Sequence, residues 1–262
     1  EDLLDAVSSL GLSLVVKTRR LGYDGKGQFQ VREPAELDAA WQALGAAPLI
    51  AEQWVPFDFE VSCIGVRNVD GDVAMYPLSR NVHENGILRT SRSPVDAPDL
   101  AALAGDYVRR LLQRLDYVGV LALELFVCDD DLMANEFAPR VHNSGHWTIE
   151  GSVTSQFENH LRAVMNRPLG STASVGHAGM VNLIGEIPDA ARNLGAGVLH
   201  DYGKSPRPGR KLGHITVSAE TAAERDRLGQ TVERERARRE KAESQRERFE
   251  HALNDANQRA AR

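Results

Sequence analysis

Apolar and polar positions change their spacing several times along the chain, from short apolar runs to recurrence every three or four residues. Short runs rich in Val, Ile and Leu predict β-strands, and the longer period predicts amphipathic helices. We expect strands over residues 12–17, 29–32, 48–55, 60–66, 73–78, 118–127, 132–137, 180–184 and 211–217. We expect helices over residues 2–10, 34–44, 99–115 and 155–165.

Strands and helices follow one another without strict βαβ alternation, which favours an α+β fold. We expect a larger unit over residues 1–168, a small β-rich unit over 169–222 and a charged tail over 223–262. The tail has few sizeable apolar residues and no heptad seam, so a solvated helix or a disordered segment is expected rather than a coiled coil. Asp70-Gly71, between two predicted strands, is typical of a two-residue hairpin.

The composition is that of an ordinary globular protein, with 262 residues, 42% hydrophobic residues and a formal net charge of −6. This mild acidity gives no reason to expect nucleic acid or a membrane surface as a partner. No apolar run reaches the roughly 18 residues of a membrane-spanning helix, and no signal peptide is evident. Cys63 and Cys128 lie in apolar runs, so we expect reduced core residues and a cytoplasmic protein.

Glu124 and Glu136 lie in two predicted strands on either side of Asp130. If the strands pair about Asp130, residues whose numbers sum to 260 face each other, and the two glutamates are opposed on one face. Opposed like charges destabilise a sheet, and Glu124 lies in an apolar run where an uncompensated charge is costly. A divalent cation such as Mg²⁺ would compensate, and Asn135 offers a further oxygen. Two surface glutamates are the alternative interpretation.

A glycine-rich segment follows the first predicted strand, which ends at Lys17. Three glycines within six residues allow the backbone N–H groups to curl around an anion, and Lys26 adds a positive charge. The pattern is neither a Walker A motif nor a Rossmann fingerprint, so a turn with a solvent-exposed lysine is an equal alternative. The segment consists of Gly22, Tyr23, Asp24, Gly25, Lys26, Gly27 and Gln28.

A short polar segment follows Glu136 and contains Arg140, His142, Asn143 and His146. The planar fork of an arginine matches a planar oxyanion such as bicarbonate, and the imidazole and amide could complete its hydrogen bonds. Two histidines also allow zinc, but no cysteine or third histidine is close in sequence. A polar loop that caps the next helix is the remaining alternative.

Together these segments resemble the ATP-grasp superfamily of ligases, and within it the N5-carboxyaminoimidazole ribonucleotide synthetases. The resemblance covers about residues 10–218 and is most specific over 135–148 and 207–214. It also rests on residues 15–17, 22–28, 52–55, 60 and 83–90. It implies an ATP-grasp domain of antiparallel sheets flanked by helices over 1–168, followed by a small C-terminal β-rich domain and the charged helix.

The resemblance also implies a role for each segment. Lys17 and the glycine-rich segment, with Lys26 at its tip, would close over the phosphates of ATP, and Arg140, His142 and Asn143 would position bicarbonate. Glu124 and Glu136 would hold Mg²⁺, with Mn²⁺ as an alternative. The nucleotide would be bound by Glu52, Gln53, Trp54, Val55, Glu60, His83, Asn135 and Glu136. The 5′-phosphate of a ribonucleotide substrate would be bound by Lys204, Arg207, Arg210 and Lys211.

The implied reaction has two steps. Bicarbonate attacks the γ-phosphate of ATP to give carboxyphosphate and ADP, and the amine of 5-aminoimidazole ribonucleotide then takes the carboxyl group, directly or through carbon dioxide. These small molecules are the expected substrates, and a homodimer is the expected assembly.

Three departures from the family pattern predict a fragment. Its members carry an N-terminal domain that is absent from this chain, and the first part of the nucleotide-binding subdomain is short. The tail after about Ala222 differs from their compact ending. Another ATP-grasp enzyme, such as a biotin carboxylase or a formate-dependent ribonucleotide transformylase, is one alternative. A truncated nucleotide-binding module without activity is the other.

Overall fold

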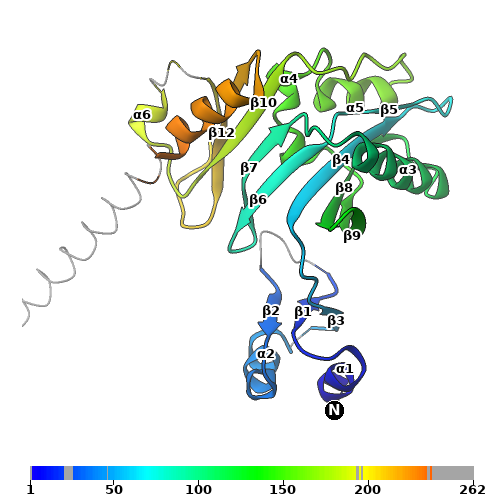
Figure 1. Ribbon diagram of the computed structural model, residues 1–262, viewed down its shortest axis with the longest axis vertical. Helices are drawn as coiled ribbons and strands as arrows, with labels where there is room; N and C mark the ends of the chain where they lie inside the picture. Colours follow the sequence, from blue (N-terminus) through cyan, green and yellow to red (C-terminus); the bar gives the residue numbers. More distant parts are fainter. Residues whose placement is uncertain are drawn as a thin grey trace, which may run out of the picture.

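The computed structural model describes residues 2–20, 26–45, 47–192, 195, 197–234 and 237. Within these residues the strands form a three-stranded sheet and a nine-stranded sheet. The smaller sheet and two helices lie at one end of the molecule, and the chain passes from it into the larger sheet between β3 and β4 (Figure 1).

The small sheet has the order β2-β1-β3, with antiparallel neighbours. Leu14, Val16 and Val31 of its strands are buried against Leu37 and Ala40. The helix predicted over residues 34–44 begins as a 3₁₀ turn, with its proline in the first turn, and continues as an α-helix. The elements are α1 (Asp2–Leu10), β1 (Leu14–Thr18), β2 (Gln28–Val31), η1 (Pro34–Glu36), α2 (Leu37–Leu44) and β3 (Leu49–Gln53).

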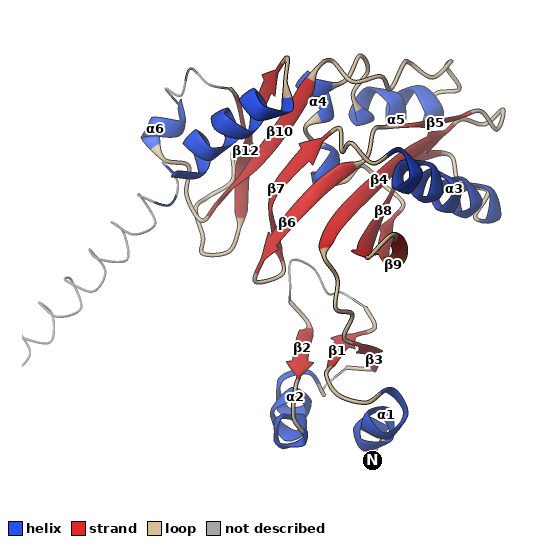
Figure 2. Ribbon diagram, viewed as in Figure 1, coloured by secondary structure: helices blue, strands red, loops and turns tan. Residues whose placement is uncertain are grey.

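The large sheet has the order β11-β12-β10-β7-β6-β4-β8-β9, and β5 pairs with β4 (Figure 2). All of its pairings are antiparallel. Its strands are β4 (Phe59–Arg67), β5 (Val73–Met75), β6 (Ser79–Glu84), β7 (Ile87–Ser93), β8 (Gly119–Cys128), β9 (Asp131–Ala138), β10 (His177–Ile184), β11 (Val198–Asp201) and β12 (Lys211–Ala219). Its helices are α3 (Pro98–Arg114), η2 (Asn143–Gly145), α4 (Thr148–Gly151), α5 (Gln156–Val164) and α6 (Asp189–Arg192), and residues 222–234 are also helical.

Alternating residues of the central strands bury both faces of the large sheet. On one face, Val61, Cys63 and Leu123 pack against α3. On the opposite face, Ile64 and Ala122 pack with a residue of α5. The candidate acidic and basic residues on the strands of the large sheet lie on this second face, which we call the site face.

The main elements agree with the sequence predictions, with exceptions that have physical causes. Strands β6, β7 and β11 were not predicted. In β6 and β7 the buried positions include Asn81 and Ser91, which hydrogen-bond to each other, so the apolar pattern of a strand is missing. The hairpin at Gly71 is confirmed, but the prediction of a two-residue loop is wrong, because the last pair is Arg67 with Val73.

The predicted C-terminal strands continue the large sheet, since β10 pairs directly with β7. The division into units at residue 169 therefore stays a prediction. Cys63 is buried, Cys128 is half-buried, and neither forms a disulfide. Among the described residues, none of the helices has the length and apolar character required to span a bilayer.

Candidate functional site

The predicted acidic pair is present, because Glu124 and Glu136 are directly opposed in the β8–β9 hairpin. The register reaches this pair in a way that the sequence did not indicate. The turn pairs Cys128 with Asp131, and a bulge at Asn135 then shifts the pairing by one residue. The pairing of the two glutamates thus depends on the bulge.

The bulge also decides which face Glu136 occupies. Leu132 and Ala134 lie on the face of α3, where Leu132 is buried in the core. Residues two apart in a regular strand share a face, so Glu136 would follow them. The extra residue Asn135 reverses this and places Glu136 beside Glu124 on the site face.

A second bulge, in β12, places a lysine on the site face. Gly213 pairs with Leu183 and Lys211 pairs with Ile184, so Leu212 is the extra residue. His214 pairs with Asn182, two residues before Ile184. Lys211 and His214 therefore share the site face, although their positions differ by three and would lie on opposite faces of a regular strand.

Glu124 is nearly buried, and its Oε1 has no hydrogen-bond partner among the described residues. Burial raises the pKa of its carboxyl to about 7, with further contributions from the negative charges of Glu136 and Glu60, while the charges of His83 and Lys211 act in the opposite direction. An acid with this pKa is poised to lose its proton when a cation approaches.

His83 of β6 hydrogen-bonds to Glu60 of the neighbouring strand β4. The Oε2 of Glu60 lies 2.7 Å from the Nδ1 of His83. Burial disfavours the imidazolium, but the hydrogen bond and charge of Glu60, together with the charge of Glu124, outweigh burial and raise the pKa of His83. The structure thus brings three of the predicted residues, Glu60, His83 and Glu124, into one electrostatic cluster.

The carboxylates of the site could supply only some of the ligands of a magnesium ion. The described residues contain no group of three or more His, Cys, Asp or Glu side chains that could hold a metal. Two carboxylates, one with an unpartnered buried oxygen, suit Mg²⁺ that takes its other ligands from nucleotide phosphate and water. The zinc alternative has no such support, because it requires three or four protein ligands.

The segment after β9 is fixed by a buried glutamine. Gln156 accepts a hydrogen bond from the backbone N–H of His142 at 3.0 Å and donates to its carbonyl at 2.7 Å. Burial, followed by the positive charges of Arg140 and Lys211, lowers the pKa of His142 to about 3. The imidazole is therefore neutral, and its 3.6 Å approach to Glu124 is not an ion pair.

Asn143 is held by a partner that the sequence analysis did not single out. Its side-chain amide exchanges two hydrogen bonds, of 3.1 and 2.7 Å, with the fully buried Asn182. Asn182 also donates to the carbonyl of Leu88 in β7. The sequence could have indicated Asn182, because it is a polar residue within the apolar run of β10. The same kind of pattern identified Glu124 in β8.

The predicted nucleotide residues of the N-terminal region belong to the small sheet. The Lys17 ammonium pairs with Glu52 at 2.6 Å, so the predicted phosphate ligand and the first residue of the predicted adenine segment contact each other. Gln53 ends β3, and the side chains of Trp54 and Lys26 are exposed. Gly27 and Gln28 follow at the start of β2, Val55 is half-buried, and Gly22, Tyr23, Asp24 and Gly25 lie outside the described residues.

The predicted phosphate-binding residues are divided between a loop and a strand. Lys204 and Arg207 are exposed, and Arg210 is half-buried, in the loop between β11 and β12. Lys211 is on β12 and contributes to the electrostatics of Glu124 and His142. The structure therefore brings Lys211 to the acidic cluster and places the other three in the loop.

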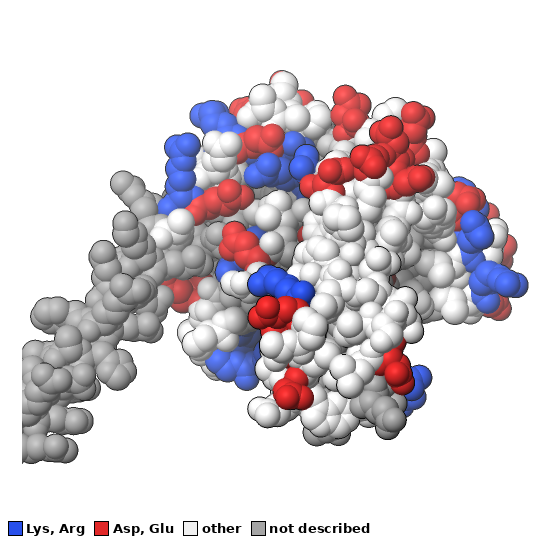
Figure 3. Space-filling model, turned by 60° about the horizontal axis from the view of Figure 1, so that its bottom comes forward, with Lys and Arg blue, Asp and Glu red and all other residues white. Residues whose placement is uncertain are grey.

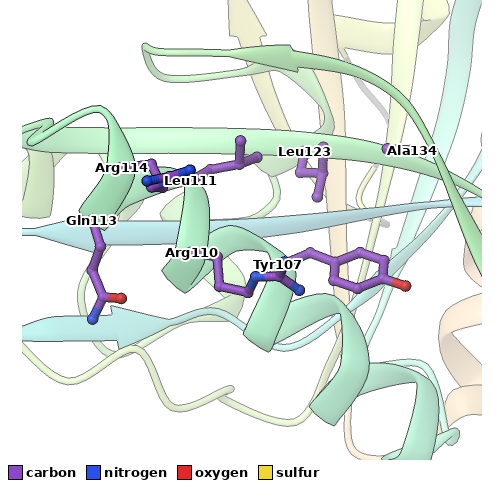
Figure 4. A pocket seen from close by; sticks show the side chains of 7 residues that line it. All are labelled: Tyr107, Arg110, Leu111, Gln113, Arg114, Leu123 and Ala134. Carbon is purple, nitrogen blue, oxygen red and sulfur yellow. The ribbon is translucent and has the colours of Figure 1, made fainter.

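A cavity of about 730 Å³ lies elsewhere and is not the candidate site (Figure 4). It lies between α3 and the strands β8 and β9, where Leu123 and Ala134 point away from the site face. On the face shown in Figure 3, basic and acidic side chains lie side by side in small groups around a broad uncharged area.

An antiparallel sheet that presents opposed glutamates with cationic groups on one face suits the binding of a metal nucleotide. Residues 1–157 match the family described as the ATP-grasp domain, and residues 178–227 match the phosphoribosylaminoimidazole carboxylase C-terminal domain. The chain belongs to the ATP-grasp family.

Within this family, the chain is similar to proteins of one kind. The chain is 55% identical to N5-carboxyaminoimidazole ribonucleotide synthase of Pseudomonas aeruginosa, over 82% of the chain and 60% of the relative. The N5-carboxyaminoimidazole ribonucleotide synthetase of Thermus thermophilus superposes with a TM-score of 0.80 at 50% identity, covering 87% of the chain and 62% of that structure. N5-carboxyaminoimidazole synthase of Aspergillus clavatus, in complex with ADP and 5-aminoimidazole ribonucleotide, gives 0.82 at 32% identity, covering 90% and 65%. The chain spans about 60% of the length of the curated relatives that it matches.

Proposed function

We propose that the protein carrying this chain is an ATP-dependent ligase that carboxylates 5-aminoimidazole ribonucleotide to N5-carboxyaminoimidazole ribonucleotide, with release of ADP and phosphate, in purine biosynthesis. The observation that carries the proposal is the pairing of Glu124 and Glu136 on the face that Lys211 shares. The names and bound ligands of the relatives support the same substrates.

Each group on the site face has a place in this reaction. Mg²⁺ held between Glu124 and Glu136 would neutralise the charge of the transferred phosphoryl group. Arg140 would bind bicarbonate with its guanidinium fork, and the neutral His142 would hydrogen-bond to it without adding charge.

The proposed reaction transfers a phosphoryl group in its first step and a carboxyl group in its second. A bicarbonate oxygen forms a bond to the γ-phosphorus, and the bond from that phosphorus to ADP breaks. The exocyclic amine then forms a bond to the carboxyl carbon, phosphate leaves, and the amine loses a proton. Carbon dioxide released from carboxyphosphate is an alternative electrophile. Lys17 and the segment 22–28 would exclude water from this labile acyl phosphate.

A cytoplasmic location suits these soluble metabolites and the two free cysteines. The homodimer implied by the resemblance also remains a proposal.

The test is the dependence of ADP release on both substrates. Full-length protein with Mg²⁺ and ATP should release ADP only when bicarbonate and 5-aminoimidazole ribonucleotide are both present. Release with biotin or with formate in their place would identify a different ATP-grasp reaction. ATP binding without any turnover would favour an inactive nucleotide-binding module.

A further inference from the structure

Tyr202 is a half-buried residue at the base of the exposed basic loop. It follows β11, and its backbone N–H donates to the carbonyl of Leu212 in β12 at 2.8 Å, so it closes the neck of the loop. Its ring lies 5.0 Å from the ammonium of Lys204, which is a cation–π contact. Residues 203–209 beyond it are exposed.

The phenol of Tyr202 is fixed by a buried histidine. Its hydroxyl oxygen lies 2.8 Å from Nδ1 of His214, which is 1% exposed. Burial, with the charges of His146 and His200, lowers the pKa of His214 to about 3, and burial raises the pKa of Tyr202. The phenol is therefore protonated and the imidazole neutral, and the two groups share one hydrogen bond whose direction is set by the tautomer of His214.

His214 also has a fixed environment on the site face. It pairs with Asn182 on one side and His200 on the other, and its ring stacks on His200 at 4.5 Å. The Nε2 of His200 lies 2.7 Å from a carboxylate oxygen of Glu150 in α4. The histidine that hydrogen-bonds to Tyr202 is thus held by three elements.

This polar group contacts the segment assigned to bicarbonate. The ring of His146 lies 5.3 Å from His214 and 6.3 Å from Tyr202. Its Nδ1 lies 3.1 Å from Nε2 of Gln156, the residue that fixes the backbone of His142. A shift of the basic loop and a shift of the bicarbonate segment therefore act on the same buried side chains.

We propose that Tyr202 is a positioning residue that holds the basic loop over the site face, so that Lys204 meets the phosphate of the ribonucleotide substrate. This inference rests on the proposed function. Loss of the hydroxyl frees the loop to adopt other orientations, and substrate binding must then order it again. The effect falls on the ribonucleotide and not on ATP, whose predicted ligands lie on other strands.

The experiment compares full-length wild-type protein with Tyr202→Phe, which removes only the hydroxyl. We expect KM for 5-aminoimidazole ribonucleotide to rise about fivefold or more, the value of one lost hydrogen bond, with KM for ATP and kcat at saturation retained. Tyr107→Phe on α3, on the opposite face, is the matched control and should behave as wild type. His214→Gln, whose side-chain amide can still hydrogen-bond to the Tyr202 hydroxyl, should recover part of the affinity that His214→Ala loses.

Coupling to the loop provides the second readout. Lys204→Gln should raise the ribonucleotide KM in wild type, and by a smaller factor in the Tyr202→Phe background. An unchanged ribonucleotide KM in Tyr202→Phe overturns the inference, as does a parallel change in kcat, every KM and Tm, which would indicate a structural role alone. Wild-type protein that releases no ADP with these substrates overturns the proposed function and this inference together. Active wild type with an unaffected Tyr202→Phe overturns only the inference.

Discussion

Glu124 makes the unliganded protein less stable as the pH rises, and Glu124→Gln should remove that penalty. Its pKa is raised from 4.5 to about 7, mainly by burial. At about 1.4 kcal/mol per unit, the difference amounts to about 3 kcal/mol between the fully protonated and fully ionised limits. Glutamine has nearly the same shape and no charge, so the variant isolates the cost of the buried carboxylate.

The sign of the effect follows from proton binding. Between pH 4.5 and about 7, the folded state holds the Glu124 proton more tightly than the unfolded state. The free energy of unfolding therefore falls as the pH rises through this window and levels off above it. Relative to wild type, Glu124→Gln should gain about 3 kcal/mol between about pH 4.5 and pH 8.

Urea unfolding at several pH values, with a chelator and without nucleotide, measures this difference. Glu220→Gln, at an exposed position after β12, is the control and should follow wild type. Adding Mg²⁺ with ADP at pH 8 should stabilise wild type more than Glu124→Gln, because the cation compensates the carboxylate. Parallel stability curves for wild type and Glu124→Gln would refute the assignment of a buried carboxyl with a raised pKa.

Three other outcomes are expected. Glu136→Gln should abolish turnover in the full-length protein while the far-ultraviolet circular dichroism stays that of wild type, and activity near the wild-type level would count against a shared cation. Arg140→Lys should lower kcat/KM for bicarbonate by at least about tenfold, because a point charge does not replace a planar fork; an equal loss for ATP would show that the residue acts elsewhere. In an NMR titration His142 should stay neutral down to about pH 5, whereas His83 should titrate above pH 6.5; a shared midpoint would contradict the environments described.

The sequence predicted the fold best where apolar residues follow a recognisable pattern. The helices α1, α3 and α5 were found because one face of each is apolar, and the strands β1, β4 and β8 because each contains a short apolar run. It failed in β6 and β7, where buried Asn81 and Ser91 satisfy each other and a partner on β4. Hydrogen bonds between side chains on three strands have no signature in a window along the chain.

The candidate site was predictable as a set of chemical groups but not as a geometry. A carboxylate in an apolar run indicated Glu124, yet the positions of Glu136 and Lys211 depend on bulges at Asn135 and Leu212. A bulge arises from local backbone packing, and neither extra residue is a glycine or a proline that would have indicated it.

The direct pairing of β7 with β10 has a consequence for dissecting the protein. A chain cut after residue 168 would leave β7 as an exposed edge strand, and its unpaired backbone N–H and C=O groups could pair with any extended peptide. Such a truncated product would self-associate, and a separately produced C-terminal piece would have the complementary border at β10. The two pieces, mixed while both are unfolded, are the natural candidates for a split protein that reassembles along this seam.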